Sequence, residues 1–406
     1  MPYGKNYLKS KLASKQHRVD LRYKCYEMKH YVKDLGISTP PSLRAMQSTL
    51  GWCAKAVDSL ADRLQVYSFA NDVFDMQTIF NMNNPSVLYD SAILGALIAS
   101  CSFIYVSADK DGFPRLQVID GNDATGIMDP ISGFLSEGYA VLTRDENGSV
   151  TSDAYFTHGY TEFWSKEDGI HTVFNSCAYP LLVPIIYRPD ARRPFGHSRI
   201  SRACIDLVSS ASRTIKRSEI SAEFYSFPQK YLLGVSEDVE IEDKWKASMS
   251  ALLTITKDDD GDHPVIGQFQ QQSMNPHMDQ LRMFASLFAA ETGLTIDDLG
   301  FPTENPSSAE AIKSQHENLR LMARKAQRNF GYGFIQAGYL ASCLANNLNL
   351  NRSELYRTKI LWEPIFEPDY STLSAMGDGI IKINNSVPGY IGSETLRRMT
   401  GIEGEN

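Results

Sequence analysis

The segment from residue 292 to residue 330 reads TGLTIDDLGFPTENPSSAEAIKSQHENLRLMARKAQRNF. Gly293 is typical of a residue that ends a helix, and Gly300 and Pro302 indicate that a loop follows it. The Ser-x-x-Glu spacing of residues 307–310 is a capping box, which predicts that a long helix begins there. Loops of this length between two helices are usually functional. Because no nucleophile–base pair or metal-ligand set accompanies the loop, the sequence predicts a loop that contacts a partner rather than one that catalyses a reaction.

The overall composition is that of an ordinary globular chain. It has 406 residues, of which 43% are hydrophobic and 22% charged, so it can bury a core and can hold two or three subdomains. Its net charge of −8 argues against a non-specific DNA-binding surface, since such surfaces are basic. The charge is compatible with DNA that slides past the protein without adhering to it.

Cysteine spacing and apolar runs indicate the compartment. The six cysteines are dispersed and form no C-x-x-C pair, so we expect reduced thiols in a cytosolic setting and no zinc site. The N-terminus has no apolar signal-peptide region. The longest apolar run, Ala92–Val106, is shorter than the roughly 20 residues that a membrane helix needs. The sequence therefore predicts a protein made inside the cell and without a membrane span.

Hydrophobic periodicity predicts helices over residues 1–65, one of them opening at Ser42, and again over 198–225 and 277–291. Between these helices, short β-branched or aromatic runs separated by Asp-Gly and Asn-Gly turns predict an antiparallel meander. The runs are Ser102–Val106, Arg115–Ile119, Gly138–Thr143 and Ala154–Phe156, with further strands expected at Pro184–Tyr187, Lys230–Leu233 and Thr358–Trp362.

Glycines mark two other places in the chain. Gly331 and Gly333 lie inside the expected long helix and indicate a bend or a close-packing point. Gly389 separates two short helices expected after the last strand.

The acidic run Asp258–Asp262 raises the question of a metal site. With Gly261 as the loop glycine, the first ligand position of an EF-hand would fall on Thr256, so that template fails. A solvated turn is the favoured interpretation, because Asp and Gly are preferred turn residues. The sequence also contains no H-E-x-x-H motif and no phosphate-binding glycine loop. We therefore expect no cofactor, no metal and no enzymatic activity.

Basic residues gather in two places, and each allows two interpretations. One group is Arg188, Arg192, Arg193, Arg199 and Arg202, followed on the polar side of the next helix by Arg213 and Lys216. The other is a stripe on the expected long helix, Lys313, Arg320, Arg324 and Arg328. Either group is a solvated, salt-bridged face, or it contacts an acidic neighbour, which could be another subunit or nucleic acid.

Several motifs occur together in an order that resembles one known family, the portal proteins of long-tailed double-stranded DNA bacteriophages. The motifs are Pro184–Tyr187, Gly196–Ile200, Phe227–Gly234, Thr292–Gly293, Leu299–Gly300 and Ser307–Ile312, preceded by Trp52, Val57–Asp58 and Leu60–Arg63 and followed by Thr358–Trp362. Each motif alone is weakly specific, whereas their order and spacing are fairly specific. The similarity covers nearly the whole chain.

The resemblance implies an α+β portal-like fold and a division of the chain. Residues 1–198 would form the wing, with a helical N-terminus and the β meander, 199–225 and 277–292 the two stem helices, 226–276 the inserted clip, 293–306 the tunnel loop, 307–348 the long helix, and 349–406 a strand returning to the wing and a short helical crown.

The resemblance also implies a function. The protein would form a ring, typically a dodecamer, at the capsid vertex of the virion after synthesis in the host cytoplasm. The ring would conduct double-stranded DNA during packaging and ejection. Its partners would be the large terminase subunit, the head-tail connector, and the major capsid and scaffold proteins, with no membrane.

Candidate contact residues follow from this placement. The tunnel loop would contribute Leu299, Gly300, Phe301, Pro302, Thr303, Glu304 and Asn305 to the DNA channel. Subunit or DNA contacts would come from Arg192, Arg193, Arg202, Arg213, Lys216, Lys313, Arg320, Arg324 and Arg328. The clip would turn Glu237, Asp238, Asp258, Asp259 and Asp260 toward the motor and the connector.

Two other functions stay open from sequence alone. One is a metal-dependent DNA-processing enzyme that combines Asp258–Asp262 with distant carboxylates. The other is a different structural virion protein, such as a capsid or connector component.

Overall fold

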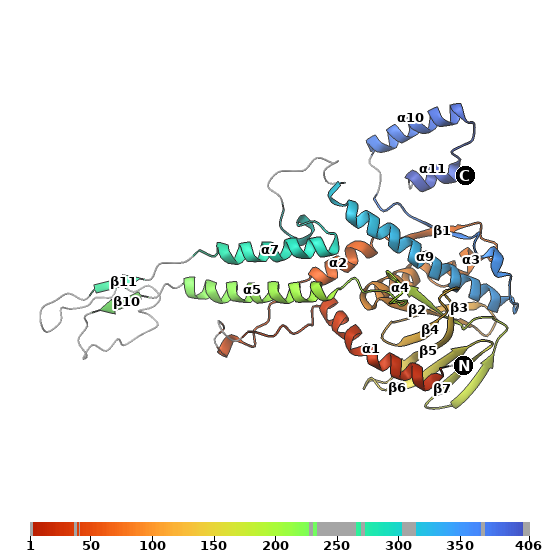
Figure 1. The fold of residues 1–406 in the computed structure, drawn as a ribbon, viewed down its shortest axis with the longest axis horizontal. Coiled ribbons are helices and arrows are strands. Elements are labelled where there is room, and N and C mark those ends of the chain that lie inside the picture. The colour runs from red at the N-terminus through yellow and green to blue at the C-terminus, as the bar shows by residue number, and fades with distance from the viewer. Residues whose placement is uncertain are drawn as a thin grey trace, which may run out of the picture.

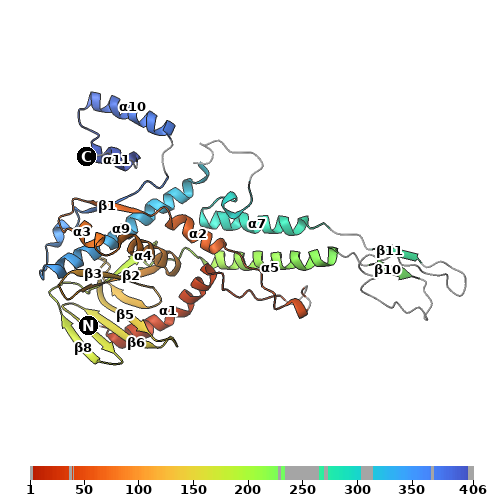
Figure 2. The ribbon, with the colours of Figure 1, turned by 180° about the vertical axis from the view of Figure 1, so that it is seen from behind.

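The computed structural model describes residues 3–35, 39, 41–226, 230–233, 265–268, 273–302, 314–366 and 370–400. The chain forms a body of helices and sheets. Two long helices, α5 (Arg202–Ser226) and α7 (Asn275–Thr292), lie side by side and project from one side of this body (Figure 1). The view from behind shows the same two helices side by side (Figure 2). The expected α+β class is confirmed.

One sheet of the body is a five-stranded antiparallel meander. Its strands are β4 (Ala124–Met128), β5 (Leu135–Arg144), β6 (Val150–Thr157), β7 (Tyr160–Ser165) and β8 (Gly169–Phe174), in that order across the sheet. The Asn147-Gly148 turn joins β5 to β6, as the sequence predicted, and Gly148 has a φ of 78° that suits glycine. Each strand pairs with the next along the chain.

A second sheet corrects the prediction of a single meander. It has the order β3 (Pro114–Ile119), β2 (Cys101–Ala108), β9 (Leu182–Ile186), all antiparallel. The first four residues of β9 are buried, as are the first four of β2. β2 lies between β3 and β9, in the centre of its own sheet rather than at the edge of the meander. Its buried residues on both faces are typical of such a central strand.

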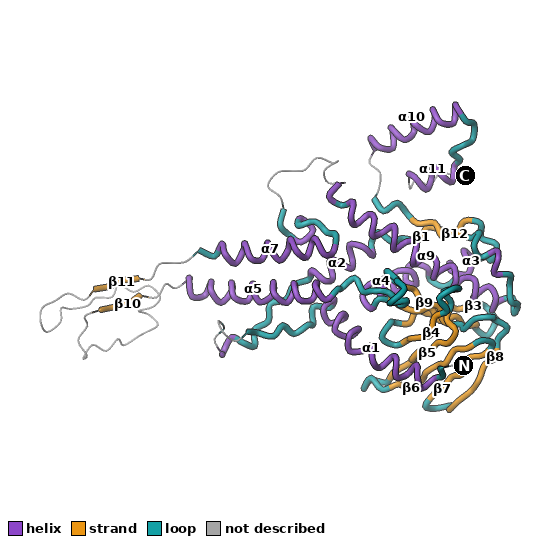
Figure 3. The backbone as a smooth tube through the Cα atoms, viewed as in Figure 1, coloured by secondary structure: helices purple, strands orange, loops and turns teal. Residues whose placement is uncertain are grey.

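Helices cover this smaller sheet. α4 (Pro85–Ala99) packs on β2 and β3, and α9 (Glu317–Ala345) packs on β9 and β2 (Figure 3). The apolar run Ala92–Val106 is therefore divided between α4 and β2. The division falls at Ser100, whose φ of 92° ends the helix. Among the described residues, no helix has the length and apolar character needed to cross a membrane.

The N-terminal region contains two helices joined by an extended segment. These helices are α1 (Lys5–Tyr26) and α2 (Trp52–Ala61). The helix expected to open at Ser42 is wrong, because residues 41–43 form a single 3-10 turn and α2 begins ten residues later. Tertiary contacts take the place of a helix here: Lys216 of α5 forms an ion pair with Asp34 at 2.9 Å and donates a hydrogen bond to the carbonyl of Arg44 at 2.9 Å.

The remaining elements complete the body and its projections. α3 (Met76–Asn81) packs on α9, and β1 (Val66–Ala70) pairs with β12 (Lys359–Trp362), which brings the late strand back to the body as a two-stranded ribbon. β10 (Lys230–Leu233) pairs with β11 (Val265–Gln268) beyond the ends of α5 and α7. α10 (Tyr370–Ser386) and α11 (Ser393–Thr400) follow β12 and stand away from the body.

Glycines let the long helix α9 pack closely on the sheet region. A Cβ atom at Gly331 would lie 2.5 Å from Ile360, and one at Gly333 would lie 2.7 Å from Ile185. The helix runs through both positions without ending. Of the two predicted roles, the close-packing role is therefore the one that the structure shows.

Polar contacts dock α1 on the meander. At the edge strand β4, Lys11 donates to the carbonyl of Gly126 at 2.7 Å and Lys15 donates to the carbonyl of Ala124 at 2.8 Å. These carbonyls point outward from the sheet, so the lysine side chains occupy acceptors that another strand would otherwise reach. Burial lowers the pKa of both lysines. One edge of the meander is thus covered by α1.

A carboxylate pair holds the start of α1. The buried Asp153 of β6 forms ion pairs with Lys5 at 2.9 Å and with Lys9 at 2.8 Å. Glu137 of β5 accepts the backbone N–H of Gly4 at 2.9 Å, so a negative charge stands at the N-terminus of the helix, where its dipole favours one. The opposite sheet edge differs, because all six residues of β8 are exposed, including Ile170 and Phe174.

Candidate functional site

The projecting pair of helices is the first candidate site. α5 and α7 pack through the buried side chains of Cys204, Val208 and Ala211 on α5 and of Ala285, Phe288 and Ala289 on α7. Thr214 also donates a hydrogen bond to Gln280 across the pair at 3.1 Å. Three apolar side chains of α7 are exposed, Met278 to 56% and Met283 and Leu287 to 50% each, and the four-residue spacing of Met283 and Leu287 places these two on one face of the helix. Apolar side chains on a projecting helix are typical of a surface that another protein covers.

The segment between α7 and α9 is the second candidate. Gly293 ends α7 with a φ of 69°, as the sequence predicted, and a 3-10 turn follows at Asp297–Leu299. Asp298 fixes this turn by accepting hydrogen bonds from the N–H and hydroxyl of Thr295, both at 2.9 Å. Gly300 then has a φ of 90°, a conformation that glycine adopts readily.

Two residues of the expected tunnel loop belong to the core instead of standing free. Leu299 is 7% exposed and Phe301 packs against the main core, whereas Gly300 and Pro302 are exposed. Thr303, Glu304 and Asn305 lie outside the described residues, as does the capping box at 307–310. The described long helix begins at Glu317.

The basic stripe on α9 divides into paired and exposed residues. Arg320 forms a two-pronged contact with Glu317, at 2.6 and 2.5 Å, which is the solvated salt bridge of the first interpretation. Arg324 and Arg328 are exposed. Lys313 lies outside the described residues.

The basic loop before α5 is held by one aspartate. Asp190 accepts the backbone N–H groups of Arg192 at 2.8 Å and Arg193 at 2.7 Å, and its other oxygen lies 2.5 Å from His197. The hydrogen bond to His197 and those from the backbone lower the pKa of the Asp190 carboxyl. Both arginine side chains are therefore presented to solvent from an ordered turn.

The basic residues of α5 differ in their exposure and in their partners. Arg202 is almost fully exposed and lies 3.9 Å from Asp206 one turn later. Arg213 donates to the hydroxyl of Ser210 at 2.9 Å. Lys216 is 6% exposed because Asp34 and the carbonyl of Arg44 surround its ammonium group. Its charge is satisfied inside the chain, so Lys216 does not offer a contact to a partner in this structure.

Sequence reasoning missed the role of Arg199. It was grouped with the surface arginines, but its side chain is 6% exposed and its guanidinium group reaches three helices. Nε donates to the carbonyl of Ala56 in α2 at 3.0 Å, Nη2 to that of Thr292 in α7 at 2.6 Å, and Nη1 to the sulfur of Met322 in α9 at 3.0 Å. One signal in the sequence was available: Arg199 lies inside the motif Gly196–Ile200, one of those on which the family resemblance rests.

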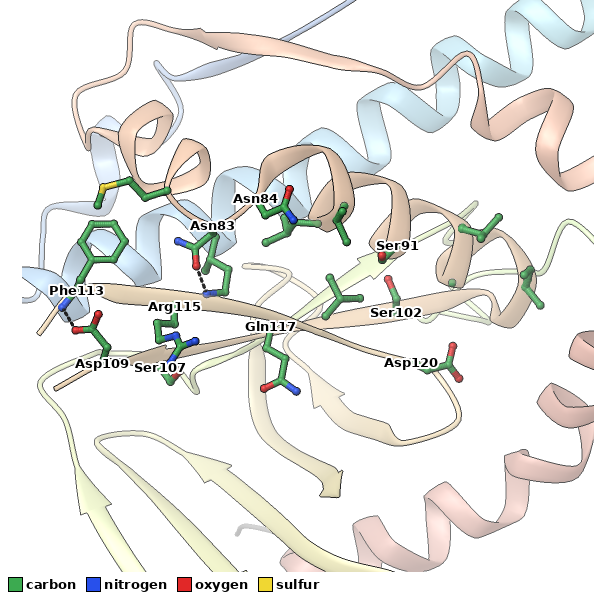
Figure 4. Close-up of a pocket in the computed structure, with 18 of the residues that line it drawn as sticks. Asn83, Asn84, Ser91, Ser102, Ser107, Asp109, Phe113, Arg115, Gln117 and Asp120 are labelled. Atoms are coloured by element: carbon green, nitrogen blue, oxygen red, sulfur yellow. Dashed lines mark hydrogen bonds between the residues drawn. The ribbon is translucent and has the colours of Figure 1, made fainter. Parts of the chain in front are cut away.

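A groove of about 1370 Å³ lies between α4, the β2–β3 hairpin and the end of α1 (Figure 4). Asn83 lines it and pairs with the backbone of β3, accepting from Leu116 at 2.9 Å and donating to Pro114 at 3.0 Å. Asp120 also lines it, and burial raises the pKa of its carboxyl, which accepts a hydrogen bond from Tyr23. The lining contains no histidine, cysteine or lysine.

The metal hypothesis finds no support in the part of the chain that the structure describes. No group of three or more His, Cys, Asp or Glu residues there could hold a metal ion. Asp258, Asp259 and Asp260 lie outside the described residues, as do Glu237 and Asp238.

Comparison with known proteins identifies the family. A family model described as "Phage portal protein, SPP1 Gp6-like" matches residues 5–369. Since this match spans most of the 406 residues, the chain belongs to that family of phage portal proteins. The resemblance noted in the sequence is confirmed.

Two relatives are similar over almost the entire chain. The portal protein of Mycobacterium phage D29 is 22% identical over 396 residues, which cover 93% of this chain and 81% of the relative. The portal protein of Mycobacterium phage L5 is 21% identical over 392 residues, which cover 92% and 80%.

Solved structures with a similar arrangement come from gene transfer agent (GTA) particles. One chain, from the virion of a native GTA particle, is 11% identical with a TM-score of 0.46, over 87% of this chain and 90% of that one. Another, from the neck of a native GTA particle computed with C12 symmetry, is 12% identical with a TM-score of 0.44 over the same shares. The family assignment rests on the sequence match and not on these structures.

Proposed function

We propose that this portal protein assembles into a closed dodecameric ring at the capsid vertex of a phage virion and conducts double-stranded DNA through its centre. Family membership supports the proposal, and one structural observation carries it. That observation is the projecting α5–α7 pair, in which α7 exposes Met283 and Leu287 on one face. Large apolar side chains in this position are stabilised when a neighbouring copy covers them.

The ring geometry requires two different surfaces on each copy. A closed cyclic ring is built from heterologous contacts, in which one surface of a copy meets another surface of the next. We propose that the face of α7 with Met283 and Leu287 is one of these surfaces and that the exposed Arg202 and the half-buried Arg213 of α5 contribute to the contact.

The division of labour within the ring is also proposed. The α5–α7 pair is the stem, the segment between α7 and α9 faces the channel, and β10, β11 and the residues between them form the clip. The clip docks the large terminase subunit during packaging and the head-tail connector afterwards. The body is the wing, which contacts the major capsid and scaffold proteins, and α10 with α11 forms the crown. The net charge of −8 suits a bore along which DNA phosphates slide without adhering.

Negative-stain microscopy and mass photometry of the purified full-length chain test the proposal. We expect closed rings with a central channel. The double substitution Met283→Lys and Leu287→Lys places two charges in the proposed contact, so we expect rings to give way to folded monomers. Leu348→Lys is the matched control, because Leu348 is 59% exposed and lies at the far end of α9.

Two results would contradict the proposal. One is a wild-type protein that stays monomeric or stops at compact dimers at high concentration. The other is an unchanged yield of rings from the double variant, which would place the subunit contact elsewhere.

A further inference from the structure

The buried side chain of Arg199 contacts several helices at once. Its backbone N–H donates to the carbonyl of Leu97 near the end of α4 at 2.8 Å. Its guanidinium group reaches Ala56, Thr292 and Met322 on α2, α7 and α9. A single residue therefore joins two helices of the body to α7 and to α9.

The positions of two of these contacts are specific. Thr292 is the last residue of α7, and Met322 lies near the described start of α9. The segment that links the two helices begins at Gly293, where an added Cβ would approach the Met322 side chain to 3.0 Å. Arg199 thus contacts the chain immediately before this segment and again shortly after it.

The charge of Arg199 is stabilised without a carboxylate. Among the described residues no ion pair of Arg199 is present, and its partners are two carbonyl oxygens and a sulfur. The Thr292 carbonyl belongs to the last turn of α7, where the helix dipole is negative and carbonyls lack partners within the helix. A planar guanidinium can reach three acceptors in different directions, whereas a lysine ammonium on an unbranched stem matches this geometry poorly.

We propose that Arg199 is a positioning residue that clasps both ends of the α7–α9 segment to the body and so fixes where that segment stands in the channel. The clasp itself follows from the contacts, and its consequence for DNA rests on the proposed function. Rotation or slippage of α7 against α9 has to break at least one of the three guanidinium contacts. Hydrogen bonds to a charged donor are among the stronger ones in proteins.

Two substitutions test whether Arg199 acts through the three contacts of its guanidinium group or only through its charge or its volume. Arg199→Lys keeps the positive charge, and Arg199→Met keeps most of the buried apolar volume, but neither can make the three contacts. If only charge mattered, lysine would preserve the wild-type behaviour, and if only packing mattered, methionine would. Arg18→Met is the matched control, since Arg18 is an exposed arginine of α1 that belongs to none of the proposed contacts.

Hydrogen–deuterium exchange of the assembled full-length protein is the measurement. In both Arg199 variants we expect amides at 293–302 and 317–325 to exchange about tenfold faster, a change that the loss of one charged hydrogen bond can produce. Amides of α5 at 205–216 serve as an internal reference and should exchange at the wild-type rate. The Arg18→Met protein should match wild type throughout. Met322→Leu, which removes the sulfur acceptor at similar volume, should give a smaller change at 317–325 and can be read if an Arg199 variant fails to fold.

DNA retention in particles built with the same variants separates the clasp from the channel role. Faster exchange together with loss of packaged DNA supports both. Faster exchange with normal DNA content supports the clasp and contradicts the proposed place of the segment in the channel. Wild-type exchange at 293–302 and 317–325 in the Arg199 variants and in Met322→Leu would overturn the clasp, whatever the particles contain.

Discussion

At the scale of single residues, close packing rather than surface chemistry explains most of the unusual positions in this chain. In α9, Gly331 lies against Ile360, Gly333 against Ile185 and Gly338 against Met76, and each position has space for a hydrogen atom only. Arg199 follows the same logic, since its guanidinium group fills a junction of helices. Local sequence shows neither property directly, because both depend on residues that lie far away in the chain.

A first prediction concerns Gly331. Gly331→Ala should lower the free energy of unfolding by about 1–3 kcal/mol, because its Cβ would lie 2.5 Å from Ile360 in a packed interior. Chemical unfolding measures the change. Gly377→Ala in α10 is the control, since nothing lies within 4 Å of that Cβ and alanine favours helix, so it should be neutral or slightly stabilising. Equal effects at the two positions would contradict the packing argument.

A second prediction concerns the thiols. All six cysteines are buried and unpaired, and burial raises the pKa of Cys25 to about 11 and that of Cys177 to about 12. Because the thiolate is the reactive form, the native protein should react slowly with a thiol reagent at pH 8 and release all six thiols after unfolding. Rapid labelling of any cysteine in the native protein would contradict this expectation.

At the scale of elements, the helix α1 shows how polar residues dock a helix. Its apolar contacts with the meander are few, with Leu8 and Leu12 meeting Tyr139, Val141 and Tyr155. The remaining contacts are hydrogen bonds and ion pairs from lysine side chains to backbone carbonyls and carboxylates of the sheet. Such a helix has almost no amphipathic pattern in its sequence. The sequence could therefore predict that the helix exists, but not the surface on which it packs.

A third prediction follows for the ion pairs of α1. Asp153→Asn should lower stability by about 1–3 kcal/mol, because Lys5 and Lys9 lose a carboxylate that is 1% exposed, while both lysines are partly solvated and keep some hydration. Limited proteolysis within residues 5–26 should become faster. Glu162→Gln is the control: its side chain is 31% exposed, so a change below about 0.5 kcal/mol is expected. Unaltered proteolysis of the Asp153 variant would show that apolar contacts alone hold α1.

The same carboxylates predict how α1 responds to pH. Burial opposes their charge, yet Lys9, Lys5 and Tyr139 hold the pKa of Asp153 below its ordinary value, and the N–H of Gly4 with Tyr155 does so for Glu137. Depressed pKa values stabilise the folded state above the unfolded pKa of about 4, and this stabilisation is lost as pH falls further. Exchange of α1 amides should therefore be constant from pH 7 to about pH 5, after correction for intrinsic rates, and rise at lower pH. The effect should be smaller in Asp153→Asn.

The sequence predicted most of the elements because their signals are local. The Asn-Gly and Asp-Gly turns, the αL glycine at 293 and the periodicity of α5 and α7 all lie within a few residues of the element they define. The division of the strands into two sheets depends on β9, which joins β2 from about eighty residues away. A helix was expected to open at Ser42 because the apolar spacing after it is helical, but residues 41–43 form only a 3-10 turn, and Asp34 and Arg44 bind Lys216 of α5. For the candidate site, Lys216 and Arg199 were both read as surface cations, since burial of a charge cannot be seen without its partners.

At the scale of the whole molecule, the core and the channel-facing segment can be separated by experiment. Leu299 is 7% exposed and should be needed for folding, so Leu299→Ala should cost about 2–4 kcal/mol of stability. Residues 303–305 lie outside the described residues, and the proposed function assigns them to the segment that faces the channel. We expect deletion of these residues to leave stability and ring formation intact and to impair packaging or retention of DNA, measured as DNA content of purified particles. Normal DNA content in the deletion variant would remove these residues from the proposed mechanism.

The meander has one covered edge and one bare edge, and this asymmetry limits what the free protein can do before assembly. Two copies can join β8 to β8, but each then presents only its β4 edge, where the amines of Lys11 and Lys15 already occupy the outward carbonyls. Strand pairing through this sheet therefore stops at two copies and cannot propagate into a fibre. The lysines of α1 therefore prevent the exposed strand β8 from starting a fibre.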